Sequence, residues 1–319
     1  MNYPKRVLIR EDGPREGFQF EKGPIPTDRK IALIDALSDT GLKDIQIASF
    51  VHPDKVPGMA DAEAIAARYR RRDGVTYRGL WLNARGLERA LATKRIDVRG
   101  HLSGVASEPF SKRNTGRTRQ EDIAAARAMA ALYRRNNIPI TTISIMAAFG
   151  CNIMGTVPHS CVIETNEDLL AIVDECGGGE PTISLADTMA WANPNSIRAL
   201  LGAVRARWPG HALALHLHDT RGLAMANALA GLEMGVARFD ASVAGLGGCP
   251  FAKHSGAAGN ICTEDLAFMC EELGIETGID IEALCEAGRL AETIVGHPLP
   301  GRVKQGGGLA KLRREKALV

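Results

Sequence analysis

The chain alternates short β-branched or apolar runs with helix-like stretches, and this alternation continues over eight expected strands. The expected strands are residues 6–10, 44–50, 76–82, 96–104, 139–145, 182–186, 212–218 and 237–243. The expected helices are residues 27–40, 60–72, 85–93, 120–135, 166–176, 195–208, 222–235, 263–273 and 279–295. Thr27 and Thr263 stand where helix N-caps are expected. Eight strand–helix units predict a (β/α)8 TIM barrel, an α/β fold, with extra C-terminal helices.

A doubly wound sheet is the alternative fold, and it would be expected to carry a glycine-rich fingerprint after its first strand. Here residues 11–17 read EDGPREG, which is a polar turn instead. We therefore treat residues 1–319 as one catalytic barrel domain. Its expected parts are the barrel at about 6–245, a lid loop at 246–260, C-terminal helices at 263–296 and a basic tail at 301–319. We expect this tail to be solvated or to pack against another subunit.

The composition is that of an ordinary globular enzyme and counts against several classes of partner. The net charge is +2 and only 5% of residues are aromatic, so nothing favours binding to nucleic acid. No apolar run approaches the roughly 20 residues that span a bilayer, and the N-terminus lacks the apolar core of a signal peptide. The seven cysteines are odd in number and lack metal-type spacing, which favours a reducing cytoplasm over a disulfide framework.

Unusual polar residues gather at the predicted carboxyl ends of the strands, where barrel enzymes carry their active sites. They are Arg15, Glu16, Gln46, Ser49, Asp187, Thr188, His216, His218, Cys249 and Asn260. Residues scattered at random would rarely share one rim of a barrel, so this gathering predicts the active site.

The pair His216 and His218 is the strongest chemical signal in the chain. The two are separated by one residue on a predicted strand, so their side chains point to the same face, into the barrel, while the intervening leucines face the helices. Two stacked imidazoles with a carboxylate in reach are better explained by a divalent cation than by core packing. Asp219 follows directly and is expected to orient one of the rings. A mixed nitrogen and oxygen ligand set favours Mg²⁺ or Mn²⁺ over a closed structural zinc site.

Residues 244–260 read AGLGGCPFAKHSGAAGN, a glycine-rich stretch typical of a mobile active-site lid. Cys249 lies in this loop, which favours a role as proton donor or nucleophile over an inert thiol. His254 is expected to be a surface residue first, and a substrate contact second.

Six runs of this chain resemble 3-hydroxy-3-methylglutaryl-CoA (HMG-CoA) lyase, a metal-dependent TIM-barrel enzyme. They are GPREGFQFE (13–21), SFVHPDKVPGMAD (49–61), SEPFSKRN (107–114), ISLADT (183–188), LHLHDT (215–220) and VAGLGGCPFA (243–252). The resemblance runs from residue 6 to about residue 296 in the order of the family. The combination of AGLGGCP with HxHDT is specific, whereas HxH alone indicates only a wider group of barrels that make or break carbon–carbon bonds.

The resemblance implies a retro-Claisen cleavage of a 3-hydroxyacyl-CoA into acetyl-CoA and a keto product. The metal ligands that it implies are Glu16, His216, His218 and Asn260. Arg15 would stabilise the thioester oxygen as the enolate forms, His216 or Glu16 would assist removal of the hydroxyl proton, and Cys249 would protonate the enolate. Asp187 would hold the site together. The implied contacts to acyl-CoA are Gln19, Gln46, Ser49, Lys112, Asn114 and Thr188, with Arg113 as a further candidate for the phosphates.

Three departures from the family pattern line the same expected pocket. The usual Arg-Asp pair is Arg15-Glu16, the usual glutamate on the second strand is Gln46, and the loop from Cys249 to Asn260 is longer by two residues. A changed set of acids around a chelated substrate indicates either an altered substrate or an altered route for the proton. The substrate is therefore expected to be HMG-CoA or a relative such as citramalyl-CoA.

Two other functions remain open. An aldolase or condensing enzyme of the wider group would share HxHDT, although GGCP and SEPFSKRN favour the lyase. A non-catalytic barrel that binds acyl-CoA would explain Gln46 and Glu16, although it would not need Cys249. We expect the protein to form a homo-oligomer and to bind an acyl-CoA thioester.

Overall fold

The apolar runs of the sequence form one sheet of eight strands in the structure, a computed structural model that describes residues 3–21, 23–248 and 259–316. The strands are β1 (Leu8–Glu11), β2 (Asp44–Ser49), β3 (Thr76–Leu80), β4 (Gly100–Val105), β5 (Ile140–Met146), β8 (Thr182–Asp187), β9 (Leu213–Leu217) and β10 (Arg238–Ala241). Their order in the sheet is β3-β2-β1-β10-β9-β8-β5-β4, and every pairing is parallel.

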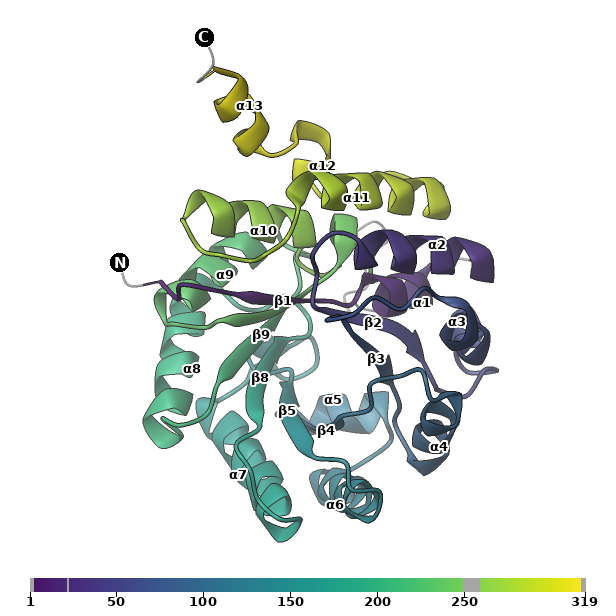
Figure 1. The fold of residues 1–319 in the computed structure, drawn as a ribbon. Helices are drawn as coiled ribbons and strands as arrows, with labels where there is room; N and C mark the ends of the chain where they lie inside the picture. Colours follow the sequence, from purple (N-terminus) through teal and green to yellow (C-terminus); the bar gives the residue numbers. More distant parts are fainter. Residues whose placement is uncertain (1–2, 22, 249–258, 317–319) are drawn as a thin grey trace.

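The sheet curls so that the first and last strands of the chain lie side by side, as Figure 1 shows. Strands β3 and β4 are the two edge strands of this sheet, and no backbone ladder of the described residues pairs them with each other. Asp97, three residues before β4, joins these two edges: its backbone N–H donates to the carbonyl of Tyr77 at 2.8 Å, and its carboxylate accepts from the Tyr77 N–H at 2.7 Å. The predicted (β/α)8 barrel is therefore confirmed.

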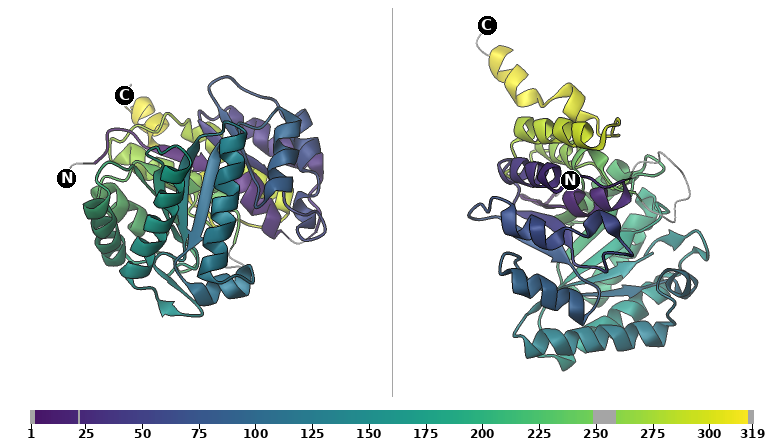
Figure 2. Two further views of the ribbon diagram at one scale, coloured as in Figure 1. Left: turned by 90° about the horizontal axis from the view of Figure 1, so that it is seen from below. Right: turned by 90° about the vertical axis from the view of Figure 1, so that its right-hand side faces the viewer.

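Helices surround the strands and cover the outer face of the barrel (Figure 1). They are α2 (Thr27–Ser38), α3 (Ala62–Arg68), α4 (Ala84–Thr93), α6 (Arg119–Arg135), α7 (His159–Glu175), α8 (Pro194–Arg207) and α9 (Ala224–Glu233). Of the extra C-terminal helices, α11 (Ile281–Val295) packs against α2, and α10 (Thr263–Glu272) packs against α11. In the right-hand view of Figure 2 these C-terminal helices, in yellow-green, lie above the purple N-terminal helices. The alternation of inward polar and outward apolar side chains in the strands lets these helices bury the core.

Several predicted boundaries and caps are wrong. The segment 96–99 lies outside β4, because Asp97 bonds to Tyr77 instead of joining a ladder. Helix α7 starts at His159, seven residues before the predicted start, because Val162 and Thr165 pack inward and offset the weak helix propensity of β-branched residues. Thr27 and Thr263 are first helical residues without a capping bond, and their hydroxyls donate to carboxylates elsewhere in the chain.

Short elements absent from the predictions occupy the loops at the carboxyl ends of the strands. They are a π-helical turn η1 (Gly13–Gly17), α1 (Phe18–Phe20), the 3₁₀ turns η2 (Pro57–Met59) and η3 (Val243–Gly245), α5 (Glu108–Asn114) and the hairpin of β6 (Gly150–Cys151) and β7 (Gly155–Thr156). Pro109 starts α5 in its first turn, and Ser107 caps it by accepting from the Phe110 N–H.

The C-terminal segment is anchored to the barrel at its start, so Lys304 is buried where the prediction had a solvated or subunit-packing tail. Lys304, at the start of α12 (Val303–Gly306), is only 1% exposed. Its ammonium donates to the carbonyls of Leu299 and Gly301 at 2.7 and 2.6 Å and lies 3.2 Å from Glu292. The Gly301 N–H donates to the carbonyl of Ala244, near the base of the loop that carries Cys249. Helix α13 (Leu309–Lys316) then extends away from the barrel (Figure 1).

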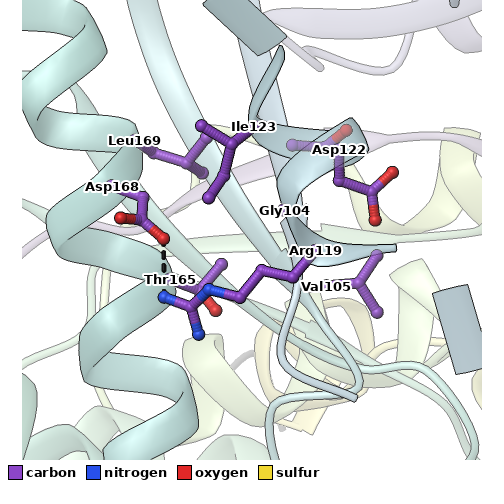
Figure 3. Close-up of a pocket in the computed structure, with 9 residues that line it drawn as sticks. Gly104, Val105, Arg119, Asp122, Ile123, Thr165, Asp168 and Leu169 are labelled. Carbon is purple, nitrogen blue, oxygen red and sulfur yellow. Dashed lines mark hydrogen bonds and ion pairs between the residues drawn. The ribbon is translucent and has the colours of Figure 1, made fainter. Parts of the chain in front are cut away.

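A small cavity lies outside the barrel between β4, α6 and α7, where Arg119 pairs with Asp168 at 2.6 Å (Figure 3). Its volume of about 20 Å³ holds about one water molecule, so it is too small for a substrate. Within the described ranges no helix combines the length and apolar character needed to cross a membrane.

Candidate metal centre and active site

His216 on β9 and His218 just after it face the barrel interior, as predicted. Leu215 and Leu217 are buried on the opposite face of the strand, against the helices. The two imidazole rings meet edge to face with their centroids 5.1 Å apart. His218 is only 5% exposed, so the pair lies deep in the mouth of the barrel.

Glu16 reaches the two histidines from the π-helical turn after β1. Its Oε1 atom lies 3.6 Å from Nε2 of His218 and 4.0 Å from Nε2 of His216. Bonds of about 2.1 Å from one cation to each atom can span separations up to about 4.2 Å. The three side chains are thus close enough to share one metal ion.

The side-chain amide of Asn260 favours a metal site over a simple cluster of ion pairs. Its Nδ2 donates to the Ser242 hydroxyl at 2.9 Å, whereas its buried Oδ1 has no hydrogen-bond partner among the described residues. A backbone bridge pairs Asn260 with His218, which keeps the amide at the cluster. A buried unpaired carbonyl oxygen costs about 1–3 kcal/mol, and a bound cation would remove that cost. The two imidazoles, one carboxylate and one amide oxygen therefore fit a divalent cation such as Mg²⁺ or Mn²⁺.

Hydrogen bonds at the Nδ1 atoms fix the orientation of both imidazole rings. Nδ1 of His216 lies 3.2 Å from the carboxylate of Asp240 on β10, and Nδ1 of His218 lies 3.0 Å from the backbone carbonyl of Asp187. These contacts leave both Nε2 atoms facing Glu16. The prediction that Asp219 orients a ring is wrong, because its carboxylate accepts the Ala224 N–H at the start of α9.

Asp240 is the site residue that the sequence analysis missed. It stands opposite His216 in the register of β9 and β10, on the inward face. Arg10 on β1 holds its other oxygen at 2.5 Å. A single aspartate in the run ARFDASV gives no sign of this role; only the strand pairing would have found it.

Neighbouring charges set the protonation of the cluster. Burial alone would raise the pKa of Glu16, but the Arg15 guanidinium and the two histidines outweigh it and hold that pKa below its ordinary value. Burial would lower the pKa of His216, yet its bond to Asp240 and the charge of Glu16 raise it to about 9. The carboxylate of Glu16 is therefore ionised at neutral pH and available as a ligand.

Arg15 lies against this cluster with its guanidinium fixed on two sides. Its Nε donates to Oε1 of Gln46, and its Nη2 lies 2.9 Å from Oε2 of Glu16. The other oxygen of Glu16 is the one that faces the histidines. Glu16 thus connects the guanidinium to the candidate metal ligands, and Gln46 fixes the orientation of the Arg15 guanidinium.

The remaining predicted rim residues have different surroundings. Ser49 Oγ and Gln19 Oε1 are buried and have no hydrogen-bond partner among the described residues, which leaves them available to a ligand. The Thr188 hydroxyl accepts the Ala147 N–H, and the carboxylate of Asp187 accepts the N–H groups of Trp191 and Ala192. Those two side chains shape the rim locally.

Asn114 and Lys112 lie on α5, the short helix after β4. Both are exposed, and Lys112 pairs with Glu108 at 2.7 Å. Cys249 and His254 fall outside the described residues, so their predicted roles stay predictions.

Comparison with known proteins identifies the family of the chain. Residues 6–291 match the HMGL-like family. The hydroxymethylglutaryl-CoA lyase YngG of Bacillus subtilis is 40% identical over 302 residues, which cover 95% of this chain and 97% of the relative. A crystal structure of hydroxymethylglutaryl-CoA lyase from Pseudomonas aeruginosa is 37% identical, with a TM-score of 0.88 over 96% of this chain and 98% of that one.

An HMG-CoA lyase from Acinetobacter baumannii, solved in complex with coenzyme A and 3-methylmalate, is 34% identical. It has a TM-score of 0.85 and covers 97% of this chain and 98% of its own. Both the sequence match and the structural match extend over nearly the whole barrel. The chain therefore belongs to the HMGL-like family.

Proposed function

We propose that the protein is a carbon–carbon lyase that cleaves a 3-hydroxyacyl-CoA, HMG-CoA or a close analogue, into acetyl-CoA and a keto acid. The observation that carries the proposal is the convergence of Glu16, His216, His218 and the unpaired oxygen of Asn260 beside Arg15. The names of the relatives support the same reaction and an acyl-CoA substrate. In this proposal residues 1–319 act as one catalytic unit.

The reaction is a retro-Claisen cleavage. The C3 hydroxyl loses its proton, its oxygen becomes the carbonyl of the keto acid, and the C2–C3 bond breaks. The bonding electron pair passes into the thioester enolate, which gains a proton at C2 and leaves as acetyl-CoA. Held by the four ligands, a divalent cation, Mg²⁺ or Mn²⁺, would supply Lewis-acid chemistry that lowers the pKa of the substrate hydroxyl.

The side chains of this protein supply the other steps. Arg15, fixed by Gln46 and Glu16, would donate hydrogen bonds to the thioester oxygen where negative charge develops. His216 or Glu16, whose Nε2 and Oε1 atoms are 4.0 Å apart, would assist removal of the hydroxyl proton. Cys249 would deliver a proton to C2 of the enolate.

The roles of the rim residues follow from their positions. Ser49 and Gln19 would hydrogen-bond the substrate with their unpaired oxygens. Asn114 and Lys112 on α5 would contact the CoA portion. Lys112 would give up its ion pair with Glu108 and bind a phosphate of CoA instead. Asp187 would keep His218 oriented through its carbonyl.

A thioester panel tests the proposal. Protein loaded with Mg²⁺ or Mn²⁺ is incubated with HMG-CoA, citramalyl-CoA and longer homologues, and acetyl-CoA is measured by chromatography. We expect release from at least one thioester, and loss of that release with a chelator or in Arg15→Met. The matched control Arg119→Met removes an arginine from an ion pair outside the barrel and should retain full activity. No release from any thioester would refute the lyase and leave the aldolase and binding functions.

A further inference from the structure

The inside of the barrel is unusually polar on the side formed by β4, β5, β8 and β9, which are neighbours in Figure 1. One inward layer across these strands consists of Ser103, Ser144, Ser184 and Ala214, paired in register. Barrels of this class normally fill such layers with bulky branched side chains. Ser184 and Ala214 are buried, whereas Ser103 is exposed and Ser144 is partly exposed, so the open part of this layer lies at β4 and β5.

Exposure on β4 shows where the space lies. A Cβ atom on Gly104 would meet Thr165 at 2.5 Å, so Gly104 faces helix α7, and alternation turns His101 and Ser103 inward. Both are nevertheless exposed to solvent, and Val105 is partly exposed. Since these three residues follow the inner face of β4 to its carboxyl end, the accessible space runs along β4 toward the site.

Cationic groups face this space. Arg10 engages Asp240 through Nε and Nη2, and Arg78 engages Asp44 and Asp12 through Nε and Nη2. In the described part of the chain, the Nη1 atom of neither arginine has a hydrogen-bond partner. Each guanidinium therefore has donors to spare for a ligand.

His101 lies on the inner face of β4, beside Ser144 of β5. Its Nε2 lies 2.9 Å from the Ser144 hydroxyl. His101 keeps contact with solvent in the lumen but is surrounded by protein, and this desolvation lowers its pKa to about 4; the charges of Arg10 and Arg78 lower it further. The imidazole is therefore neutral at physiological pH, and with the spare Nη1 donors of Arg10 and Arg78 it favours a hydrogen-bond-accepting group in this space.

Asp240 connects the arginines of the lumen with the candidate metal centre. Asp240 contacts His216 with one carboxylate oxygen and Arg10 with the other. A substrate held at His216 therefore has Arg10 one side chain away, on the inner side of the barrel. A substituent on the reacting carbon that points inward would enter this space.

We propose that the lumen beside His101, Ser144 and Arg10 is the pocket for the C3 substituent of the substrate. We propose further that this substituent is a group that ends in a carboxylate, such as carboxymethyl, where HMG-CoA has a methyl group. The proposal rests on the proposed function, because it names the substrate class of the same site. An apolar substituent of equal size would displace water from the arginines and serines without replacing its hydrogen bonds.

Keto-acid binding tests the pocket without requiring turnover. Metal-loaded protein is titrated calorimetrically with acetoacetate, 5-methyl-3-oxohexanoate and 3-oxoglutarate, the products expected for methyl, isobutyl and carboxymethyl substituents. The last two have the same shape and differ in charge. We expect 3-oxoglutarate to bind at least tenfold more tightly than the other two. His101→Leu and Ser144→Ala should each reduce that preference at least threefold with unchanged metal binding, and the control His211→Leu, outside the lumen, should retain it.

The parallel measurement uses the three corresponding CoA thioesters and follows acetyl-CoA release. A higher kcat/KM for the carboxymethyl thioester supports both proposals. A preference for 3-oxoglutarate with no release from any thioester supports the pocket and refutes the lyase. Equal or weaker binding of 3-oxoglutarate relative to 5-methyl-3-oxohexanoate, or a preference that survives both lumen variants, overturns the pocket whatever the thioesters do.

Discussion

Replacing Asn260 by leucine tests whether its unpaired oxygen is a metal ligand. In the metal-free protein the change removes one hydrogen bond, worth about 0.5–1.5 kcal/mol, and also removes a buried unpaired acceptor that costs about 1–3 kcal/mol. These effects oppose each other, so the free energy of unfolding without metal should stay within about 2 kcal/mol of the wild-type value.

The wild type and Asn260→Leu should differ in how much added metal stabilises them against unfolding. At a Mn²⁺ concentration one hundred times the wild-type Kd, binding stabilises the wild type by about 2.7 kcal/mol. Loss of an outer partner of a metal ligand already weakens binding by about 10–100-fold, so loss of a ligand should weaken it at least tenfold. Asn260→Leu should then gain at most about 1.4 kcal/mol at the same Mn²⁺ concentration.

Urea denaturation with and without MnCl₂ measures these gains. Asn227 provides a matched control, because it is equally buried, its Nδ2 donates to a backbone carbonyl and its Oδ1 is also unpaired among the described residues. Asn227→Leu should keep the full gain from Mn²⁺. An unchanged gain in Asn260→Leu, or an equal loss in both variants, would refute the role of Asn260.

Four further predictions follow from individual contacts. Asp240→Asn should weaken Mn²⁺ binding about 10–100-fold in calorimetry, because His216 loses the carboxylate that orients it. Gln46→Leu should lower kcat/KM for acetyl-CoA release at least tenfold with unchanged metal affinity, since Arg15 loses its Nε acceptor. Cys249→Ser should lose most turnover and keep metal binding. Burial raises the pKa of Glu264 to about 7, above its ordinary 4.5, so the folded state binds the extra proton and stability should fall as pH rises from 4.5 to 7. The loss is on the order of 3 kcal/mol, and Glu264→Gln should remove it in urea denaturation at several pH values.

Each of these predictions has a result that contradicts it. Unchanged Mn²⁺ affinity in Asp240→Asn would mean that the ring is fixed by packing alone. A normal rate in Cys249→Ser would remove that thiol from the reaction. Weaker metal binding in Gln46→Leu would show that the amide supports the ligands and not the guanidinium. Equal pH dependence in Glu264→Gln would assign the pH effect to other groups.

The sequence predicted the barrel because its strands carry short β-branched runs at regular intervals, and that pattern survives tertiary packing. Boundaries failed where tertiary contacts override local propensity. Residues 159–165 look poor as a helix, yet Val162 and Thr165 are buried and α7 includes them. Lys304 looked like part of a solvated tail, and only the carbonyls of Leu299 and Gly301 explain its burial.

The candidate site was predictable to the extent that it depends on alternation within one strand. His216 and His218 share a face because of their spacing, and the structure agrees. Glu16 and Asn260 were reached through the family resemblance, since they lie 244 positions apart in the chain, and no local pattern connects them. Asp240 and Arg10 were missed because their role depends on which strands are paired.

The anchoring of Lys304 and Gly301 has a consequence for how the chain is made. The backbone of Ala244 is held from both sides by late parts of the sequence: its N–H donates to Glu264, and its carbonyl accepts from Gly301. The carboxylate of Glu11, at the end of the first strand, likewise accepts hydrogen bonds from Val243 and Thr263, which are made late in synthesis. During synthesis from the N-terminus, the chain must therefore extend past Lys304 before these bonds at the mouth of the barrel can all form.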